Sequence, residues 1–285
     1  MRCAWKQLLT ILPPWIRDQL TEEHSRSLQE LRLRLHAPPE LVTGKGIFWL
    51  QGDTKDKDLD FTINTASRYS PWTSATIADC FLTAPGGHRI GICGEAVIKS
   101  GRMEGIRKVS SLCIRIARDF PGISGDLAAQ QDSVLILGAP GWGKTTLLRD
   151  LIRTRSEAGE HIAVVDERGE LFPPDFPAGK HTDILSGCPR EQGISSLLRV
   201  MGPSCIAMDE ITAPEDCQAL IRAAWCGVKL LATAHASSME DFLSREVYRP
   251  LVERRIFHTY VVLRQDRSWH LERSKGWNTN GSVRY

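Results

Sequence analysis

The sequence of 285 residues predicts an α/β domain over residues 121–285, preceded by a smaller α+β domain over residues 1–120. In the second part, short apolar runs alternate regularly with stretches of helical periodicity. In the first part, the patterns are shorter and more mixed. Between the two parts lies RDFPGISGDLAAQQDS (118–133), which is rich in turn-forming residues. A chain of this length has room for two domains of ordinary size.

Five apolar, β-branched runs in the second part predict strands. They are VLIL (134–137), HIAVV (161–165), CIAM (205–208), KLLATA (229–234) and TYVVL (259–263). The stretches with helical periodicity between them are 144–153, 193–202, 215–225 and 238–248. Continuous apolar strands alternating with helices indicate a parallel sheet covered on both faces. The more strictly alternating VVLRQDRSWHLER (261–273) predicts an antiparallel hairpin at the edge of that sheet.

Three segments of the first part carry interpretable patterns. ELRLRLH (30–36) alternates Leu with charged residues, as a half-buried strand does. HRIGICGEAVIKSGRMEGI (88–106) predicts two strands joined by a Ser-Gly turn at 100–101. We expect a helix in the second half of 65–82. Together these segments favour an α+β domain.

The composition is typical of a globular protein, with 42% hydrophobic and 25% charged residues. The net charge of +2 is small. Residues up to Asp132 include 17 basic and 15 acidic side chains, which leaves 19 of each among the chain's 36 and 34. Neither part has the basic excess of a dedicated nucleic-acid domain.

The patterns also bear on location. No apolar run approaches the roughly 18 residues that cross a bilayer, and Lys6 and Pro13–Pro14 interrupt the apolar block near the N-terminus. We therefore expect neither a transmembrane segment nor a signal peptide. The eight cysteines never form a C-x-x-C pair, and several lie in apolar runs, as Cys205 does. This predicts buried free thiols in a reducing compartment, and so a cytosolic chain.

A phosphate-binding loop is predicted where the first apolar run of the second part ends. GAPGWGKT fits G-x-x-x-x-G-K-[ST], and it stands between a strand and a helix, as such a loop requires. A chance match at a tight strand–helix turn is the alternative, and this context argues against it. The loop comprises Gly138, Ala139, Pro140, Gly141, Trp142, Gly143, Lys144 and Thr145, followed by Thr146.

Each part of this loop has a chemical reason. Glycines let backbone N–H groups surround the β-phosphate of ATP, and the helix N-terminus adds partial positive charge. Lys144 is predicted to contact the β- and γ-phosphates, and the Thr145 hydroxyl to hold Mg²⁺. Thr146 either faces the α-phosphate or caps the first turn of the helix. Trp142 either lies against the nucleotide or packs on a neighbouring loop or subunit.

The strand CIAM leads directly into two carboxylates. Asp209 at the strand end is predicted to hold Mg²⁺ through water. Glu210, one residue on, is predicted to orient and deprotonate the water that attacks the γ-phosphate. An ordinary acidic strand-to-loop boundary is the alternative. With a phosphate loop upstream, the acidic pair favours ATP hydrolysis.

Two other strand ends carry candidate residues. In VVDERGE, Arg168 either pairs with the acids around it, Asp166, Glu167 and Glu170, or reaches a neighbour's phosphates as an arginine finger. In LLATAHASS, His235 is predicted to sense the γ-phosphate, and a satisfied loop histidine is the alternative. Ligands of open α/β sheets collect at this carboxyl edge of the strands.

These motifs together resemble the stage III sporulation protein AA family. The resemblance is carried by GAPGWGKTTLLRDLIR, VVDERGEL, DILSGCPREQGISSLLRVMGPSCIAMDEI and ATAHASSMEDFL, and by ELRLRLHAPPELV in the first part. That family is similar to the hexameric ATPases of type II and type IV secretion systems, with their RecA-like motor domain. In their terms these motifs look like Walker A, Asp box, Walker B and His box. Gly169, Cys113 and Trp142 differ from the family's usual residues.

The resemblance implies a RecA-like P-loop NTPase motor that uses ATP and Mg²⁺. It implies a homo-oligomeric, hexameric ring that acts with membrane-associated proteins of a channel between mother cell and forespore. The protein would then be cytoplasmic and reach the membrane through protein partners. In secretion ATPases, arginines of the first domain and linker reach the γ-phosphate or a neighbouring subunit, and Arg107, Arg115 and Arg118 are the candidates here. A solvated strand face is their alternative.

Two other functions stay open at this point. One is a RecA-like translocase or helicase on nucleic acid, suggested by the basic window 99–118. The balanced charge and the absence of interleaved aromatic residues in that window do not favour it. The other is a nucleotide-gated scaffold that turns over slowly and mainly holds partners.

Overall fold

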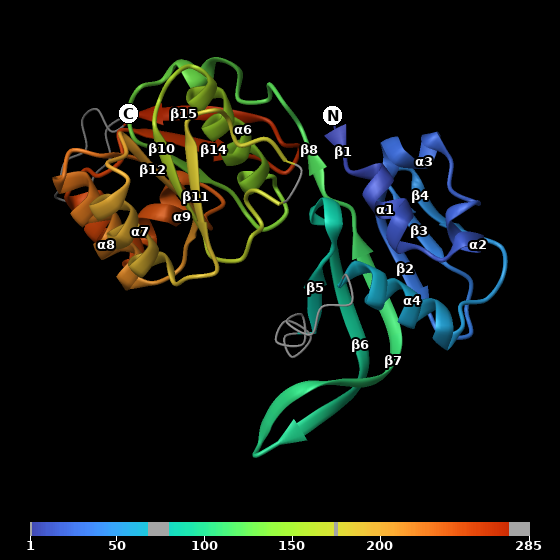
Figure 1. The fold of residues 1–285 in the computed structure, drawn as a ribbon. Helices are drawn as coiled ribbons and strands as arrows, with labels where there is room; N and C mark the ends of the chain where they lie inside the picture. The colour runs from blue at the N-terminus through green and yellow to red at the C-terminus, as the bar shows by residue number, and fades with distance from the viewer. Residues whose placement is uncertain (1, 68–79, 174–175, 274–285) are drawn as a thin grey trace. The chain divides into compact units, whose positions relative to one another are not determined.

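The computed structural model describes residues 2–67, 80–173 and 176–273. The chain forms two compact units. The smaller unit comprises residues 1–119 and 173–176, and the larger unit comprises residues 120–172 and 177–285. Figure 1 shows the elements of both units. None of the helices described is both long and apolar enough to span a bilayer.

A mainly parallel sheet forms the centre of the larger unit. Its strand order among the described residues is β11-β10-β12-β13-β9-β14-β15, and only the pair β14–β15 is antiparallel. The strands are β9 (Val134–Leu137), β10 (Ile162–Asp166), β11 (Thr182–Ser186), β12 (Cys205–Ile211), β13 (Lys229–Ala234), β14 (Thr259–Leu263) and β15 (Trp269–Arg273). The five predicted strands and the antiparallel edge hairpin are therefore confirmed.

Helices cover both faces of this sheet, as predicted (Figure 1). They are α6 (Lys144–Glu157), α7 (Arg190–Val200), α8 (Pro214–Trp225), α9 (Met239–Ser244) and α10 (Arg249–Glu253), with two 3₁₀ turns at Gly125–Ala129 and Glu246–Tyr248. One apolar cluster joins the sheet to α6 through Leu148 and Leu151. A second joins it to α7, α8 and α9 through Ile194, Leu220 and Phe242.

The helix predicted over 238–248 is broken, and β11 was not predicted. The backbone of Arg245 is extended, and its side chain turns back to Asp241, with Nε 2.9 Å from Oδ1. The chain can then fold so that Tyr248 stacks on Phe242, with ring centroids 4.8 Å apart. In β11, TDILS lies at the sheet edge and is mostly exposed, so it has no continuous apolar run to reveal it.

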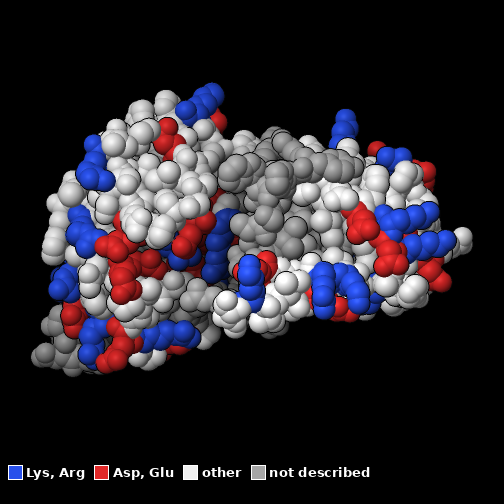
Figure 2. All heavy atoms as spheres, turned by 60° about the horizontal axis from the view of Figure 1, so that its bottom comes forward, with Lys and Arg blue, Asp and Glu red and all other residues white. Residues whose placement is uncertain are grey.

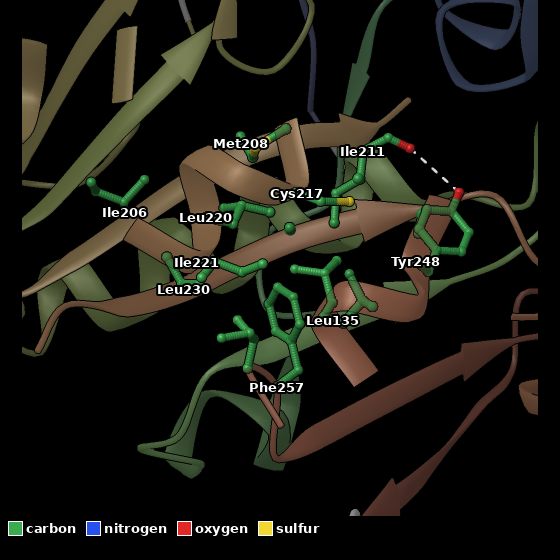
Figure 3. Packing of buried hydrophobic residues seen from close by; sticks show 14 of the residues in the cluster. Leu135, Ile206, Met208, Ile211, Cys217, Leu220, Ile221, Leu230, Tyr248 and Phe257 are labelled. Carbon is green, nitrogen blue, oxygen red and sulfur yellow. Dashed lines mark hydrogen bonds between the residues drawn. The ribbon is translucent and has the colours of Figure 1, made fainter. Parts of the chain in front are cut away.

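The core between the sheet and α8 is shown in Figure 3. Leu135, Ile206, Leu220 and Phe257 are fully buried there. The Tyr248 hydroxyl donates a hydrogen bond to the carbonyl of Ile211, at 3.3 Å, where β12 ends. A buried hydroxyl needs such a partner, and this one fixes the strand end beside the candidate site.

The smaller unit contains an antiparallel sheet in the order β4-β3-β2-β7-β6-β5. Its strands are β2 (Leu28–Arg34), β3 (Glu40–Thr43), β4 (Gly46–Trp49), β5 (Phe81–Thr83), β6 (Arg89–Lys99) and β7 (Arg102–Arg115), and β1 (Arg2–Cys3) pairs separately with β8 (Arg118–Asp119). The helices are α1 (Trp5–Ile11), α2 (Pro14–Arg17), α3 (Glu22–Ser27) and α4 (Asp56–Ala66), with a 3₁₀ turn at Pro85–Gly87.

The predicted strands of the first part are present. Ser100 and Gly101, with φ of 52° and 75°, form the tight turn between β6 and β7. Beyond its pairing with β2 and β5, this hairpin continues as a two-stranded ribbon (Figure 1). Most of the helix expected in 65–82 falls on residues 68–79, outside the described residues. α4 was not predicted, although its residues Leu59, Ile63 and Ala66 recur at helical spacing and pack into the core of this unit.

The cysteine prediction is confirmed for part of the set. The cysteines whose side chains the structure describes are free. Cys205 and Cys217 are buried, and burial raises the pKa of both thiols, that of Cys217 to about 12. Cys93 and Cys226 are exposed instead. Cys93 lies on the ribbon and Cys226 follows α8, where no layer covers them.

Replacing Leu135 by alanine is expected to destabilise the larger unit by about 2–5 kcal/mol, because it leaves a cavity between β9 and its helices. Urea unfolding followed by circular dichroism measures this loss. Val200→Ala is the control, since Val200 is 73% exposed. Equal unfolding midpoints for the two variants would contradict the position of β9 in the core.

Candidate functional site

The turn from β9 to α6 has the backbone that a phosphate loop requires. Gly141 and Gly143 have φ of 79° and 100°, values that favour glycine. A Cβ added to Gly138 would lie 3.2 Å from Leu263 Cβ and 3.3 Å from Lys144 Cγ. Lys144 is the first residue of α6. The loop therefore joins the carboxyl end of β9 to the first turn of α6.

Lys144 is only 7% exposed, and its ammonium group has two partners. Nζ donates to the carbonyl of Ala139 at 3.2 Å and lies 3.0 Å from Nδ1 of His235. Burial lowers the pKa of Lys144 below its usual value, against the opposing effect of the Glu210 and Asp209 carboxylates. The charge of this lysine is thus held in a partly desolvated place among acidic groups.

Asp209 lies between two hydroxyl groups. Thr145 Oγ1 donates to Oδ2 at 2.8 Å, and Thr233 Oγ1 donates to Oδ1 at 2.9 Å. The three residues come from α6, β12 and β13. The structure therefore brings the predicted Mg²⁺ ligands, Thr145 and Asp209, into direct contact across 64 positions of sequence.

Glu210 occupies an unusual backbone conformation. Its φ is 44°, which is uncommon for a residue with a side chain. The pairing of β12 with β13 shifts register between Met208 and Ile211, so Glu210 lies in a bulge. Its N–H points to Thr233 Oγ1 at 3.0 Å and to Asp209 Oδ1 at 3.1 Å. These bonds offset the cost of the conformation.

His235 joins Glu210 to Lys144. Its Nε2 lies 2.8 Å from Glu210 Oε1, while Nδ1 faces the lysine ammonium. An ammonium group can only donate, so Nδ1 accepts and the ring proton resides on Nε2, which donates to the carboxylate. His235 thus connects the Glu210 carboxylate to the Lys144 ammonium group.

The loop after β10 is organised by Asp166. This buried carboxylate accepts hydrogen bonds from the N–H groups of Glu170, Leu171 and Phe172, at 2.9–3.0 Å. Asp166 therefore shapes the loop and does not pair with Arg168. Three backbone donors are strong ligands for a buried carboxylate.

Arg168 is exposed, and it makes no ion pair within the described residues. Glu167 pairs with Arg190 instead, with Oε2 2.8 Å from Nη1. Arg168 lines a small hollow together with Glu170 and the Asp209–Glu210 pair. Of the two predictions for this arginine, local pairing is not found. Its role toward a neighbour stays a prediction.

The sequence left two alternatives open for each of two residues of the loop, Trp142 and Thr146. Trp142 is half-buried and packs against the apolar cluster around α6, which includes Leu147 and Leu263. The N-cap residue of α6 is Gly143, which makes no side-chain cap hydrogen bond, and a capping role of Thr146 stays a prediction. Its contact with an α-phosphate stays a prediction.

The three arginines of the smaller unit all have local partners. Arg107 Nε lies 3.1 Å from Glu95, Arg115 Nε lies 3.5 Å from Glu30, and Arg118 donates to the carbonyl of Leu28 at 2.6 Å. The first two stay more than 60% exposed. Their role toward a phosphate or a neighbour is not tested by these contacts.

Sequence reasoning missed two features of the site. The contacts of Thr233 with both Asp209 and the Glu210 N–H were not predicted, because they depend on strand order. Arg190 was not identified at all. It starts α7 and holds Glu167, and nothing in the local sequence marks it.

The donor set fits Mg²⁺. A hydroxyl and one carboxylate are hard oxygen donors, and Mg²⁺ sites on nucleotides take one or two carboxylates together with phosphate oxygens and water. Among the residues that the structure describes, no cluster of three or more His, Cys, Asp or Glu side chains forms a closed metal site. The pair Thr145–Asp209 is therefore suited to a metal that arrives with a phosphate ligand.

Solved structures share this fold. The Legionella pneumophila ATPase DotB is similar with a TM-score of 0.57 and 17% identity, over 88% of this chain and 77% of that one. The pilus retraction motor PilT, solved with bound ADP, is similar with a TM-score of 0.56 and 15% identity, over 85% and 76%. The predicted α/β fold is confirmed at this level, because both of these structures share it.

Relatives by sequence are known as well. The chain is 32% identical over 277 residues to stage III sporulation protein AA of Bacillus subtilis, covering 90% of each. It is 26% identical over 259 residues to an uncharacterised protein, ycf45, of Porphyra purpurea, where it spans 43% of the relative. The family model for sporulation stage III protein AA matches residues 4–276. The chain belongs to the stage III sporulation protein AA family.

Proposed function

We propose that the protein is a Mg²⁺-dependent ATPase of RecA-like type that hydrolyses ATP to ADP and phosphate. One observation carries the proposal: the Thr145 hydroxyl of the phosphate loop donates to the Asp209 carboxylate, with Glu210 next to it. A P-loop hydroxyl and a strand-end aspartate in contact are the two protein ligands of Mg²⁺ in P-loop NTPases. An accidental strand–helix turn would not need this pairing.

The loop from Gly138 to Thr146 binds the triphosphate. Its left-handed glycines let the backbone wrap around an anion, and the N-terminus of α6 favours negative charge. Lys144 supplies a full positive charge to the β- and γ-phosphates. Thr145, and Asp209 through water, would hold Mg²⁺, which would supply positive charge to the phosphate oxygens.

Glu210 acts on the attacking water. Its carboxylate accepts a proton as the water oxygen bonds to the γ-phosphorus and the bond to the bridging oxygen of ADP breaks. The N–H bonds to Thr233 and Asp209 hold the backbone that directs this carboxylate. His235 contacts both Glu210 and Lys144, so it is placed to register whether a γ-phosphate lies between the two.

Arg168 serves a neighbouring subunit in this proposal. It is exposed at the rim of the hollow that holds the acidic pair, and it makes no ion pair among the described residues. A guanidinium that is charged, exposed and beside the site is suited to contact phosphates bound by an adjacent copy. Arg107, Arg115 and Arg118 are secondary candidates, because each has a partner of its own.

The work done with ATP is proposed from the family and the fold. The protein energises the assembly of, or transport through, a secretion-like channel between mother cell and forespore. It acts as a cytoplasmic hexameric ring and joins the membrane through channel proteins. Membership of the stage III sporulation protein AA family supports a role in sporulation. The fold shared with DotB and PilT supports a role as an ATP-driven motor.

A nucleic-acid motor is less well supported. On the face that Figure 2 shows, basic and acidic side chains are interspersed, without a broad basic patch. In the basic window, Lys108 and Arg107 both contact Glu95, and Lys99 contacts Glu104. Tracking a phosphate backbone requires basic groups that are available over a continuous surface.

Replacing Lys144 by alanine is expected to reduce ATP turnover by roughly 10²–10³-fold, since it removes a charge that stabilises the transferred phosphoryl group. Phosphate release under saturating Mg·ATP measures the loss. Lys180→Ala is the control, because Lys180 is 78% exposed and contacts Glu157, away from the loop. Undiminished hydrolysis in the Lys144 variant would refute the assignment of this loop.

Glu210→Gln is expected to bind ATP nearly normally and to hydrolyse it about 10²–10⁴-fold more slowly, because an amide cannot take a proton from water. Binding of a fluorescent ATP analogue and phosphate release separate the two effects. The control is Glu215→Gln, five positions on and exposed in α8. If the Glu210 variant also kept full biological activity, the slow scaffold would replace the motor.

The ring proposal predicts a nucleotide-dependent change in mass. Glu210→Gln with Mg·ATP is expected to give a species of six copies in light scattering, because trapped ATP completes the contact that Arg168 makes with its neighbour. Arg168→Ala in the same background is expected to shift the distribution to smaller species. A single mass in all four conditions, with and without nucleotide, would contradict a role for Arg168 between subunits.

A further inference from the structure

The helix that follows the phosphate loop buries an unusual set of charges. Arg149, Asp150, Arg153 and Arg155 on α6 are each less than 10% exposed. Burying a charge is costly unless hydrogen bonds and opposite charges compensate for it. A helix that only covers one face of a sheet does not need such residues. Their partners therefore explain why they are there.

Asp150 holds the segment that enters the larger unit. Its Oδ1 accepts from the N–H of Gly122 at 2.9 Å, and its Oδ2 accepts from the N–H and the hydroxyl of Ser124 at 2.7 and 2.8 Å. Arg153 Nη2 adds a contact to Oδ1 at 2.7 Å. Burial alone would raise the pKa of Asp150, but these donors outweigh burial and the pKa lies below its usual value.

Two arginines of the same helix hold a second segment. Arg149 donates through Nε to the carbonyl of Leu171 and through Nη2 to the carbonyl of Glu170, the latter at 2.9 Å. Arg153 donates to the carbonyl of Pro177 at 3.4 Å. The carbonyls of Glu170 and Leu171 precede residues 173–176, and the carbonyl of Pro177 follows them. Side chains of α6 thus bind backbone groups of two separate segments, one at 122–124 and one around 173–176.

The positions of these contacts coincide with the places where the chain changes unit. The chain passes from one unit to the other after Asp119, after Phe172 and after Phe176. Gly122, Leu171 and Pro177 lie within three residues of these three places, and all of them belong to the larger unit. Every crossing of the chain is therefore anchored to α6 by a buried charged side chain.

We propose that α6 couples the nucleotide to the smaller unit, with Asp150 and Arg149 as positioning residues that transmit its movement to the crossing segments. The proposal depends on the proposed function, since it needs a nucleotide on the loop. α6 begins with Lys144 and Thr145, and Asp150 is roughly 8 Å further along the axis at 1.5 Å per residue. A helix is stiff over this distance, so a shift of its first turn moves the anchors as well.

Hydrogen exchange followed by mass spectrometry tests the coupling in the full chain. In the wild type, a non-hydrolysable ATP analogue with Mg²⁺ is expected to change exchange in peptides covering 120–126 and 168–173. Asp150→Asn, which has only one acceptor oxygen, is expected to lose the nucleotide-dependent change in 120–126 and retain it in 168–173. Arg149→Lys, which keeps the charge without the two-pronged contact, is expected to show the reverse.

The segment-specific loss separates coupling from ordinary destabilisation, because general loosening would alter both segments together. Glu157→Ala is the matched control on α6, since Glu157 contacts the exposed Lys180 and no crossing segment. Binding of a fluorescent ATP analogue is measured for each variant. Absent binding in the wild type would refute the proposed function itself. Normal binding with unchanged exchange in the wild type, or changes that persist in both variants, would overturn the coupling alone.

Discussion

The candidate site depends on one carboxylate that two hydroxyl groups hold. Asp209 lies near the end of β12, and its oxygens accept from Thr145 on α6 and Thr233 on β13. β13 lies between β12 and β9 in the sheet. β9 and β12 are therefore not neighbours in the sheet, but Thr145 after the loop still contacts Asp209 directly, and Thr233 on the intervening strand holds the other oxygen of this carboxylate. The Thr233 hydroxyl can do this and also serve the next residue, because a hydroxyl both donates and accepts.

The same threonine explains the conformation of Glu210. A left-handed backbone at a residue with a side chain costs of order 1–3 kcal/mol unless its surroundings favour it. Here the N–H of Glu210 reaches both Thr233 and Asp209, so the threonine that holds the predicted Mg²⁺ ligand Asp209 also holds this strained residue. The carboxylate is then fixed opposite His235. The same set of contacts therefore orients the Asp209–Glu210 pair and ties it to Thr145 beside the loop.

The sequence was informative where the physical signal is local. Runs such as VLIL and TYVVL are continuous and apolar because both faces of their strands are buried, and they were predicted. β11 was missed, since an exposed edge strand has no continuous apolar run, and α4 was missed although its apolar residues recur at helical spacing. The motif residues were found, but the bulge at Glu210 and the bridge through His235 depend on pairing between strands. No pattern within one segment encodes them.

The charges of α6 show the same limit most clearly. In KTTLLRDLIRTRSE, charged residues stand between pairs of apolar residues. This pattern predicts that the arginines and the aspartate face solvent on one side of the helix. The structure buries Arg149, Asp150 and Arg155 instead, because backbone groups of other loops supply their partners. An apolar residue at position 150 would leave the N–H groups of Gly122 and Ser124 without this acceptor. Both the loop before β9 and the phosphate site therefore depend on contacts with α6. In the proposed coupling, a shift at the start of this helix also moves the loop before β9.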